Sequence, residues 1–288
     1  MKGIILAGGS GTRLYPATYS VCKQLLPVYD KPMIYYPLSV LMLSNIRDIL
    51  IISTKDDLPK FKKLLGDGSL LGIKLSYSIQ EKPKGLVDAF LIGKDFIKNE
   101  SVCLILGDNL FYGDGLSALL ENSCNYVKIN KKAIIFSYTV SNPSNYGVVK
   151  LNKNKIINIK EKPKKPESKD AVIGIYMYPN EVLSLAKKIK KSKRNELEIS
   201  DLNNLFLKKK KLELRKLGRG TAWFDTGTAE NLYEAGQLIR LIEKRVGYKI
   251  GCLEEIAYKK EWISLAIYKQ HIKKLSKSEY GKYLKELL

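Results

Sequence analysis

Histidine and closely spaced cysteine are almost absent from this chain of 288 residues. It contains one histidine, His271, and four cysteines, none of which forms a Cys-x-x-Cys pair. Structural zinc sites draw their ligands from such clusters, so the composition argues against a zinc centre. Cys103 falls within an apolar strand pattern, which predicts a core position, and unpaired thiols are typical of a reducing compartment.

Hydrophobic runs long enough to cross a membrane are missing as well. A membrane span requires about 18 uninterrupted apolar residues, and no such stretch occurs, so we expect no association with a membrane. The first strand pattern begins directly after Met1 and Lys2, which leaves no room for a signal peptide. The sequence therefore predicts a cytoplasmic protein.

Acidic residues are scarce relative to basic ones. The chain has 29 Asp and Glu against 50 Lys and Arg, a formal net charge of +21. Such a charge is found in nucleic-acid-binding proteins, but no nucleic-acid-binding motif accompanies it here. The basic runs at 187–194 and 208–211 fall at the ends of predicted helices, where cations favour the helix dipole and face solvent. We therefore expect solvated basic faces that attract phosphorylated substrates, and no nucleic-acid partner.

Two common phosphate-binding motifs are missing, although a glycine-rich loop is present. The Gly-Lys-Ser/Thr of a Walker A loop does not occur, and Leu14 occupies the third glycine position of the dinucleotide fingerprint. These absences remove the main support for an ATPase or a dehydrogenase.

The glycine-rich loop follows a buried strand pattern at residues 4–7. Glycines let a backbone approach an anion closely, and the N–H groups of such a loop line a concave phosphate cradle. The residues expected around a phosphate are Gly8, Gly9, Ser10, Gly11, Thr12 and Arg13. From the loop alone, a glycine-rich turn without a ligand remains the alternative.

Strand and helix patterns alternate through the first half of the chain. Residues 48–54 and 102–106 are continuous apolar runs typical of buried parallel strands, and residues 74–80 alternate. Helices are predicted at residues 36–44, 57–65 and 85–97. This rhythm predicts an α/β fold whose central sheet is mostly parallel and covered by helices on both faces. Ligands of such sheets lie at the carboxyl ends of the strands, where the glycine-rich loop and Asp108 both fall.

In the second half of the chain, strand and helix patterns no longer alternate regularly. Strands are predicted at residues 133–140, 171–178, 212–217 and 222–225, and a hairpin joins 146–151 to 156–159 through the turn-forming residues 152–155. Helices are predicted at residues 181–191, 199–210 and 229–245, with shorter helices to the end and a break at Tyr280-Gly281. No repeat or low-complexity linker is visible. We therefore expect one catalytic core at residues 1–228 and a helical C-terminal appendage at residues 229–288.

Two aspartates stand out because each follows a strand pattern and precedes a turn. Asp108 comes after a buried strand and a glycine, and Asp225 comes directly before Thr226-Gly227-Thr228. Mg²⁺ prefers oxygen ligands and usually takes one or two carboxylates, with phosphate oxygens and water completing its shell. Turn or helix capping is the alternative role for both residues.

The ordered set of motifs resembles the sugar-1-phosphate nucleotidylyltransferases over essentially the whole chain. The matching segments are residues 8–16, 23–28 (Lys-Gln-Leu-Leu-Pro-Val), 31–34, 107–109, 146–149 (Tyr-Gly-Val-Val), 161–163 and 223–228 (Trp-Phe-Asp-Thr-Gly-Thr). The resemblance implies a three-layer, Rossmann-like nucleotidyltransferase fold with a mixed, mostly parallel sheet. It also implies Mg²⁺ as the cofactor, held by Asp108 and Asp225.

The resemblance further implies transfer of a deoxythymidylyl group from dTTP to glucose 1-phosphate, with release of pyrophosphate, as a step toward dTDP-rhamnose and related sugars. It implies a homotetramer and feedback inhibition by dTDP-rhamnose at a separate site between subunits, with the helical appendage contributing residues 254–258. Three alternatives stay open: the same chemistry with UTP or another sugar 1-phosphate, a non-catalytic nucleotide-sugar sensor on the same fold, and a nucleic-acid-binding module.

Roles for individual residues follow from the same resemblance. The residues implied in nucleotide binding are Gly8, Gly9, Gly11, Thr12, Arg13, Lys23, Gln24, Gln80, Gly85 and Asp108. The residues implied in sugar-phosphate binding are Gly147, Glu161, Lys162 and Val172. The residues implied in catalysis are Arg13, Lys23 and Lys162, whose charges would offset those of the phosphates.

The chain departs from the family pattern in two places. In the loop expected to read the base, to which Gln80 and Gly85 belong, the usual Leu-Ala-Gln-Ala after Gly85 is replaced by Leu86-Val87-Asp88-Ala89. A carboxylate thus stands where the family has an amide, in a loop where the amide of Gln80 is expected to offer both a donor and an acceptor to a pyrimidine edge. Cys22 replaces a common serine before Lys23 and is the smaller departure.

Overall fold

The computed structural model describes residues 1–9, 11–153 and 155–288, so Ser10 of the predicted phosphate loop and Asn154 of the predicted hairpin turn lie outside it. The strands are β1 (Lys2–Leu6), β2 (Pro27–Val28), β3 (Lys31–Pro32), β4 (Asp48–Ser53), β5 (Lys74–Ile79), β6 (Val102–Leu106), β7 (Asn109–Gly113), β8 (Ala133–Thr139), β9 (Gly147–Asn152), β10 (Lys155–Glu161), β11 (Asp170–Tyr178), β12 (Leu212–Lys216) and β13 (Thr221–Asp225). The helices are α1 (Tyr35–Leu43), α2 (Leu58–Leu65), α3 (Asp88–Ile92), α4 (Lys94–Ile97), α5 (Leu116–Asn130), α6 (Val182–Ala186), α7 (Ile199–Lys208), α8 (Ala229–Val246), α9 (Leu253–Lys259), α10 (Leu265–Leu275) and α11 (Glu279–Glu286).

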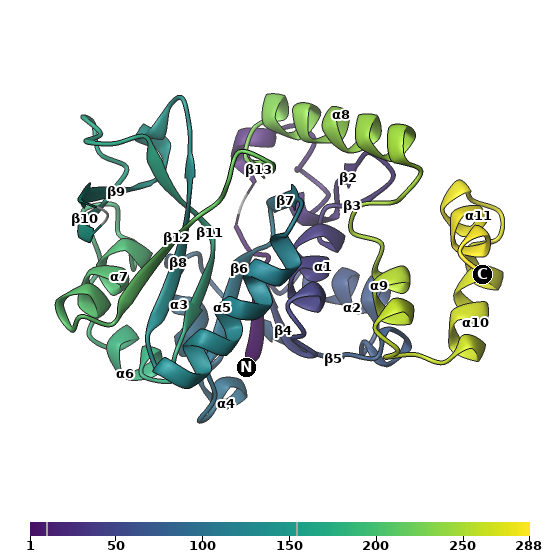
Figure 1. Ribbon diagram of the computed structural model, residues 1–288, viewed down its shortest axis with the longest axis horizontal. Helices are drawn as coiled ribbons and strands as arrows, with labels where there is room; N and C mark the ends of the chain where they lie inside the picture. Colours follow the sequence, from purple (N-terminus) through teal and green to yellow (C-terminus); the bar gives the residue numbers. More distant parts are fainter. Residues whose placement is uncertain (10, 154) are drawn as a thin grey trace.

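A mixed sheet forms the centre of the molecule, with strand order β10-β9-β11-β6-β1-β4-β5, and β8 pairs with both β11 and β12 (Figure 1). The half built from β6, β1, β4 and β5 is parallel throughout. β11 runs antiparallel to β6 and β8 and so joins this half to the rest. The predicted hairpin is confirmed, since β9 and β10 pair antiparallel with Asn152 opposite Lys155. The α/β class and the mixed sheet expected from the sequence are therefore confirmed.

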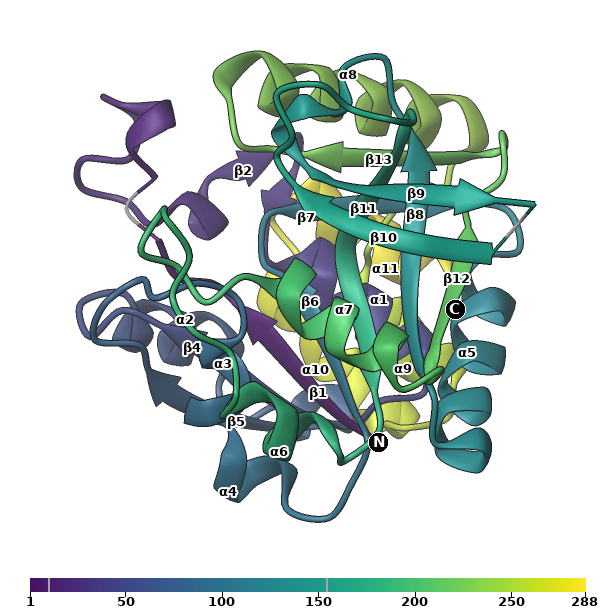
Figure 2. The ribbon, with the colours of Figure 1, turned by 90° about the vertical axis from the view of Figure 1, so that its left-hand side faces the viewer.

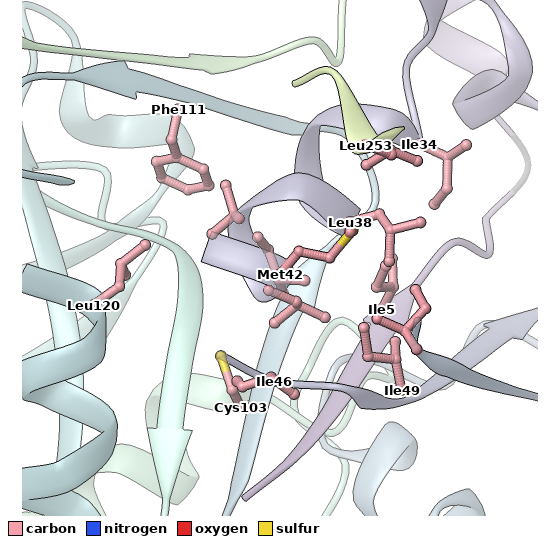
Figure 3. Packing of buried hydrophobic residues seen from close by; sticks show 14 of the residues in the cluster. Ile5, Ile34, Leu38, Met42, Ile46, Ile49, Cys103, Phe111, Leu120 and Leu253 are labelled. Atoms are coloured by element: carbon pink, nitrogen blue, oxygen red, sulfur yellow. The ribbon is translucent and has the colours of Figure 1, made fainter. Parts of the chain in front are cut away.

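The sheet is buried on both faces, which makes the fold three-layered. Ile4 and Leu6 of β1 belong to one hydrophobic cluster, while Ile5 belongs to another, because successive strand residues point to opposite faces. The Ile4 face is covered by α3, α6 and α7. The Ile5 face is covered by α1, α5 and the C-terminal helices, whose Leu253 lies near Ile34 (Figures 2 and 3).

The C-terminal helices share the core of the sheet instead of standing apart from it. Cys252, Leu253, Tyr268 and Leu284 are all buried in the same cluster as Ile5. α8 crosses one end of the molecule and packs Ala235 and its neighbours against β2 and α1 (Figure 1). Among the described helices, none combines the length and the low polarity needed to cross a membrane.

Three helix predictions were wrong in detail. The single helix expected at residues 85–97 is two short helices, α3 and α4, that meet at Gly93. α6 ends at Ala186, well before residue 191. The Tyr280-Gly281 pair lies inside α11 instead of breaking the chain, since the Ser278 hydroxyl accepts a hydrogen bond from the Gly281 N–H at 3.1 Å and starts the helix there. β7 and α5 were not expected from the sequence.

A buried ion pair ties α8 to the N-terminal part of the chain. Lys31 Nζ lies 2.9 Å from Glu243 Oε1, and the two side chains are only 2% and 5% exposed. Glu243 also accepts a hydrogen bond from the Ile250 N–H at 2.9 Å, so it anchors the turn after α8 as well. A charge this deeply buried is tolerated only while its partner is present.

We predict that Glu243→Ala lowers the free energy of unfolding by about 3 kcal/mol, because it leaves the buried Lys31 ammonium with Asp30 as its main partner. Chemical denaturation followed by circular dichroism measures the loss. Glu279→Ala, which removes the exposed partner of Lys282, is the control and should leave the free energy of unfolding nearly unchanged. Equal effects of the two substitutions would contradict a structural role for the buried pair.

Candidate active site

Two adjoining cavities open at the carboxyl ends of the strands. The larger, about 450 Å³, is lined by every residue that the sequence predicts to bind nucleotide. The smaller, about 240 Å³, is lined by every residue predicted to bind the sugar phosphate, and by Asp225. The residues that line both are Arg13, Leu86, Asp108, Lys162, Arg194 and Glu196. The wall between the cavities therefore holds three cationic side chains, Arg13, Lys162 and Arg194, and the carboxylates of Asp108 and Glu196.

The two predicted metal ligands are brought together by strand pairing. β13 pairs antiparallel with β7, which sets Asp225 opposite Asn109, the residue after Asp108. Thr226 then donates two hydrogen bonds to the Asp108 carbonyl, from its N–H at 3.1 Å and from its hydroxyl at 2.8 Å. Segments more than a hundred residues apart in sequence are thus fixed side by side with both carboxyl groups in the smaller cavity.

The two aspartates have different charged surroundings. The Lys23 ammonium group contacts the Asp108 carboxylate directly. Burial, and then the nearby Asp108 charge, raises the pKa of Asp225 above its ordinary value, although Lys23 and Arg13 oppose the shift. Because the Asp108 charge disfavours the ionisation of Asp225, the two carboxylates together form a site that favours a bound cation.

The donor set fits Mg²⁺ better than a transition metal. Across residues 1–9, 11–153 and 155–288, no group of three or more His, Cys, Asp or Glu side chains forms a candidate metal site. Two carboxylates without histidine or thiolate match the few protein ligands that Mg²⁺ takes when phosphates supply the rest. The contact between Lys23 and Asp108 shows that this position already accepts a positive charge.

The smaller cavity, where the sequence predicts sugar-phosphate binding, is lined in part by residues of β9, β10 and α7. Ser200 Oγ donates a hydrogen bond to Glu161 Oε2, and Arg194 Nη1 lies 3.7 Å from Glu161 Oε1. Burial raises the pKa of Glu161 despite the hydrogen bond from Ser200. Gly147 and Val172 line the same cavity. A carboxylate held in this way offers acceptors to hydroxyl groups.

Lys162 differs from the lysines around it. Lys160 forms an ion pair with Glu167 on the surface, whereas Lys162 lines both cavities. Its backbone is left-handed, with φ of 40°, and its N–H donates to the Tyr146 carbonyl at 3.0 Å. Its place on the wall of both cavities therefore sets Lys162 apart from Lys160.

Arg194 is the main residue that sequence reasoning missed. The basic run at 187–194 was expected to face solvent, and Arg194 is indeed exposed, but it also lines both cavities, a role that the run did not indicate. Gly85, with φ of 103°, packs against the Leu197 backbone, and the Leu197 N–H donates to the Lys84 carbonyl at 2.7 Å. The loop that contains Gly85 and the segment that contains Arg194 are thereby joined, and nothing local in the sequence predicts that contact.

Asn109 was part of a recognised motif but had no assigned role. It is buried, and its Oδ1 accepts hydrogen bonds from Trp223 Nε1 at 2.7 Å and from the Gly174 N–H at 3.1 Å. Its Nδ2 donates to Asp108 Oδ1 at 3.0 Å. One amide thus fixes β13 and β11 relative to Asp108, which is a positioning task.

The chain is similar to known proteins in both sequence and fold. The sequence profile of the nucleotidyl transferase family matches residues 2–240. A glucose-1-phosphate thymidylyltransferase of Neisseria meningitidis is 51% identical over 289 aligned positions, covering 100% of this chain and 99% of that protein. A solved Bacillus anthracis structure with bound sucrose, described as a glucose-1-phosphate thymidylyltransferase, is 40% identical, with TM-score 0.77 over 83% of this chain and 95% of that one. A UDP-glucose pyrophosphorylase bound to UDP-glucose is 26% identical, with TM-score 0.72 over 84% of this chain and 98% of that one.

We predict that the difference in melting temperature, Glu161→Gln minus wild type, grows from pH 4 to pH 7. Because burial raises the pKa of Glu161, its ionisation favours the unfolded chain, and stability falls as pH rises from the ordinary value through the raised one. The glutamine cannot ionise and escapes this loss. Thermal unfolding followed at several pH values measures the difference.

Glu167→Gln is the control with the opposite sign. Hydrogen bonds from Lys150 and Lys160 lower the pKa of Glu167 to about 2, so its ionisation favours the folded chain above its ordinary pKa. For this variant, the melting temperature relative to wild type should fall from pH 4 to pH 7. The fall should be slight, because the carboxylate is solvent-exposed. A Glu161→Gln difference that stays constant with pH would contradict the account of this site.

Proposed function

Because this chain belongs to the nucleotidyl transferase family, we propose that it transfers a deoxythymidylyl group from dTTP to α-D-glucose 1-phosphate, giving dTDP-glucose and pyrophosphate. The observation that carries the proposal is the pair of adjoining cavities whose common wall contains Arg13, Asp108, Lys162 and Arg194. A triphosphate in one cavity and a sugar phosphate in the other would meet at that wall.

The reaction is a displacement at the α-phosphorus. An oxygen of the sugar phosphate forms the new P–O bond, the bond between the α-phosphorus and the bridging oxygen breaks, and pyrophosphate leaves with the electron pair. Both reactants are anions, so their approach needs neutralisation more than it needs a protein nucleophile. Holding them in line and surrounding them with fixed charge supplies most of the rate.

The cationic side chains divide this task. Arg13 and Lys23 line the larger cavity and would bind the triphosphate and the developing charge on pyrophosphate. Lys162 and Arg194 reach both cavities and would hold the sugar phosphate against the α-phosphate. Mg²⁺ bound by Asp108 and Asp225 would add positive charge at the α-phosphate. The bonded pair Ser200 and Glu161 would orient the sugar through its hydroxyl groups.

The nearest alternative is the same reaction with UTP. The similarity to a UDP-glucose pyrophosphorylase favours it, because the two folds align over most of both chains. Thymine and uracil present the same donor and acceptors and differ by one methyl group, which changes binding modestly. We place dTTP first because relatives with half of their residues identical carry that name.

A third cavity supports a regulatory role for the C-terminal segment. It measures about 610 Å³ and lies between α1, β7 and the segment from α8 to α9. Its lining includes the aromatic side chains of Phe111, Tyr112 and Tyr248 and the charged side chains of Lys249 and Glu255. We propose that residues 229–288 make the contacts of a homotetramer and that this cavity takes a nucleotide-sugar inhibitor such as dTDP-rhamnose. A cytoplasmic location is proposed as well, since the substrates are intracellular metabolites.

The direct test is pyrophosphate release by the purified protein with Mg²⁺ and glucose 1-phosphate, comparing dTTP, UTP, CTP, ATP and GTP. We predict the highest kcat/KM with dTTP and a lower value with UTP. A preference for UTP would replace the nucleotide assignment and keep the chemistry. The absence of release with every nucleotide, by a protein that still binds dTTP, would favour the non-catalytic sensor.

We predict that Asp108→Asn and Asp225→Asn each lower kcat by about 10²–10³-fold, the usual cost of removing one electrostatic contact to the transition state. Pyrophosphate release over a Mg²⁺ titration measures the effect, and thermal unfolding checks that both variants are folded. Asp114→Asn, an exposed carboxylate after β7, is the control and should behave as wild type. Near-normal turnover of either variant at saturating Mg²⁺ would remove that residue from the metal site.

A further inference from the structure

The carboxylate of Asp88 is buried beside the expected base-reading residue. Asp88 lies in the first turn of α3 and is 7% exposed, and Gln80, at the end of β5, is 6% exposed. Gln80 Nε2 donates a hydrogen bond to Asp88 Oδ2 at 3.0 Å. Gln80 lines the larger cavity, whereas Asp88 does not reach it. Asp88 therefore acts on the cavity through Gln80.

The chemistry of the pair fixes which end of the amide faces which way. An amide has an acceptor end and a donor end of nearly the same shape, whereas an ionised carboxylate only accepts. Asp88 can therefore face only the nitrogen of Gln80. The oxygen end lies toward the glycine-rich loop, since a Cβ placed on Gly8 would come within 2.9 Å of Gln80 Oε1. A neutral amide at position 88 would accept either orientation of Gln80.

We propose that Asp88 is a positioning residue that locks the amide of Gln80, so that its Oε1 acceptor and the second N–H of Nε2 face the base. The inference rests on the proposed function and deepens it by naming what selects the nucleotide. An acceptor beside a donor matches bases in which an N–H lies next to a carbonyl, as in thymine and uracil. Cytosine presents the reverse pattern, an unprotonated N3 beside an amino group.

A fixed Gln80 amide favours thymine through matched hydrogen bonds and also disfavours cytosine through mismatched ones. Opposite cytosine, Oε1 would face an acceptor and Nε2 would face a donor, and Gln80 could turn over only by facing its oxygen to the Asp88 carboxylate. Unmatched polar groups in a buried site reduce binding far more than a missing apolar contact does. Asp88 thus adds rejection of cytosine to the recognition of thymine.

The test compares dTTP with dCTP for the wild type, Asp88→Asn and Asp88→Gln. Two quantities are measured: kcat/KM with glucose 1-phosphate, and the equilibrium dissociation constant of each nucleotide by calorimetry. Because an amide at position 88 lets Gln80 turn over, we expect the preference for dTTP over dCTP to fall roughly tenfold in both variants, mainly through tighter binding and better use of dCTP. The kcat for dTTP should change little.

Two controls separate this effect from a general disturbance. Asp95→Asn removes an exposed carboxylate from α4 and should leave the preference unchanged. In a Gln80→Ala background, Asp88→Asn should have no further effect on the preference, because the residue through which it acts is gone. A purely structural role of Asp88 would instead lower stability equally in both backgrounds and leave the preference alone.

The inference is overturned if folded Asp88→Asn and Asp88→Gln keep the wild-type preference, or if the change persists without Gln80. Failure of the proposed function is seen separately: the wild type would then release no pyrophosphate with any nucleotide. The binding constants for dTTP and dCTP still test the inference in that case, since they do not depend on turnover.

Discussion

Two carboxylates held close together in a partly buried site are the constraint around which this structure is arranged. Asp108 follows β6, one of the central parallel strands. Asp225, more than a hundred residues later in the sequence, is the last residue of β13 in a separate two-stranded sheet. Their mutual repulsion raises the pKa of Asp225 beyond the effect of burial, and Lys23 and Arg13 are placed to offset it. The hydrogen bonds from Thr226 to Asp108 hold the arrangement together against that repulsion.

The contacts that hold Asp108 and Asp225 in place extend along α8. Asn231, in the first turn of α8, donates to the Asp225 carbonyl at 2.7 Å, and Thr228 caps the same helix. The other end of α8 is fixed by the buried pair of Glu243 with Lys31. One helix therefore links the turn after Asp225 to the N-terminal part of the fold, so the C-terminal segment contributes to the site that we propose as well as to the core.

The sequence predicted the fold well where a pattern is local. Apolar runs identified β4 and β6, and motif order predicted which residues gather around the two cavities. It failed where tertiary contacts decide. Arg194 sits in a run of lysines that resembles a solvated surface, and only the packing of residue 197 against Gly85 brings it to the site. The meaning of Asp88 was equally hidden, because its effect depends on the direction of one hydrogen bond from Gln80.

The central claim is that the nucleotide and the sugar occupy separate cavities that share a cationic wall. A crystal structure of the protein with dTDP-glucose and Mg²⁺ tests it most directly. The account predicts the thymine ring against Gln80 in the larger cavity, the glucose against Glu161 and Val172 in the smaller one, and the diphosphate beside Arg13 and Lys162. Density for the base in the smaller cavity, or for a metal away from Asp108 and Asp225, would contradict it.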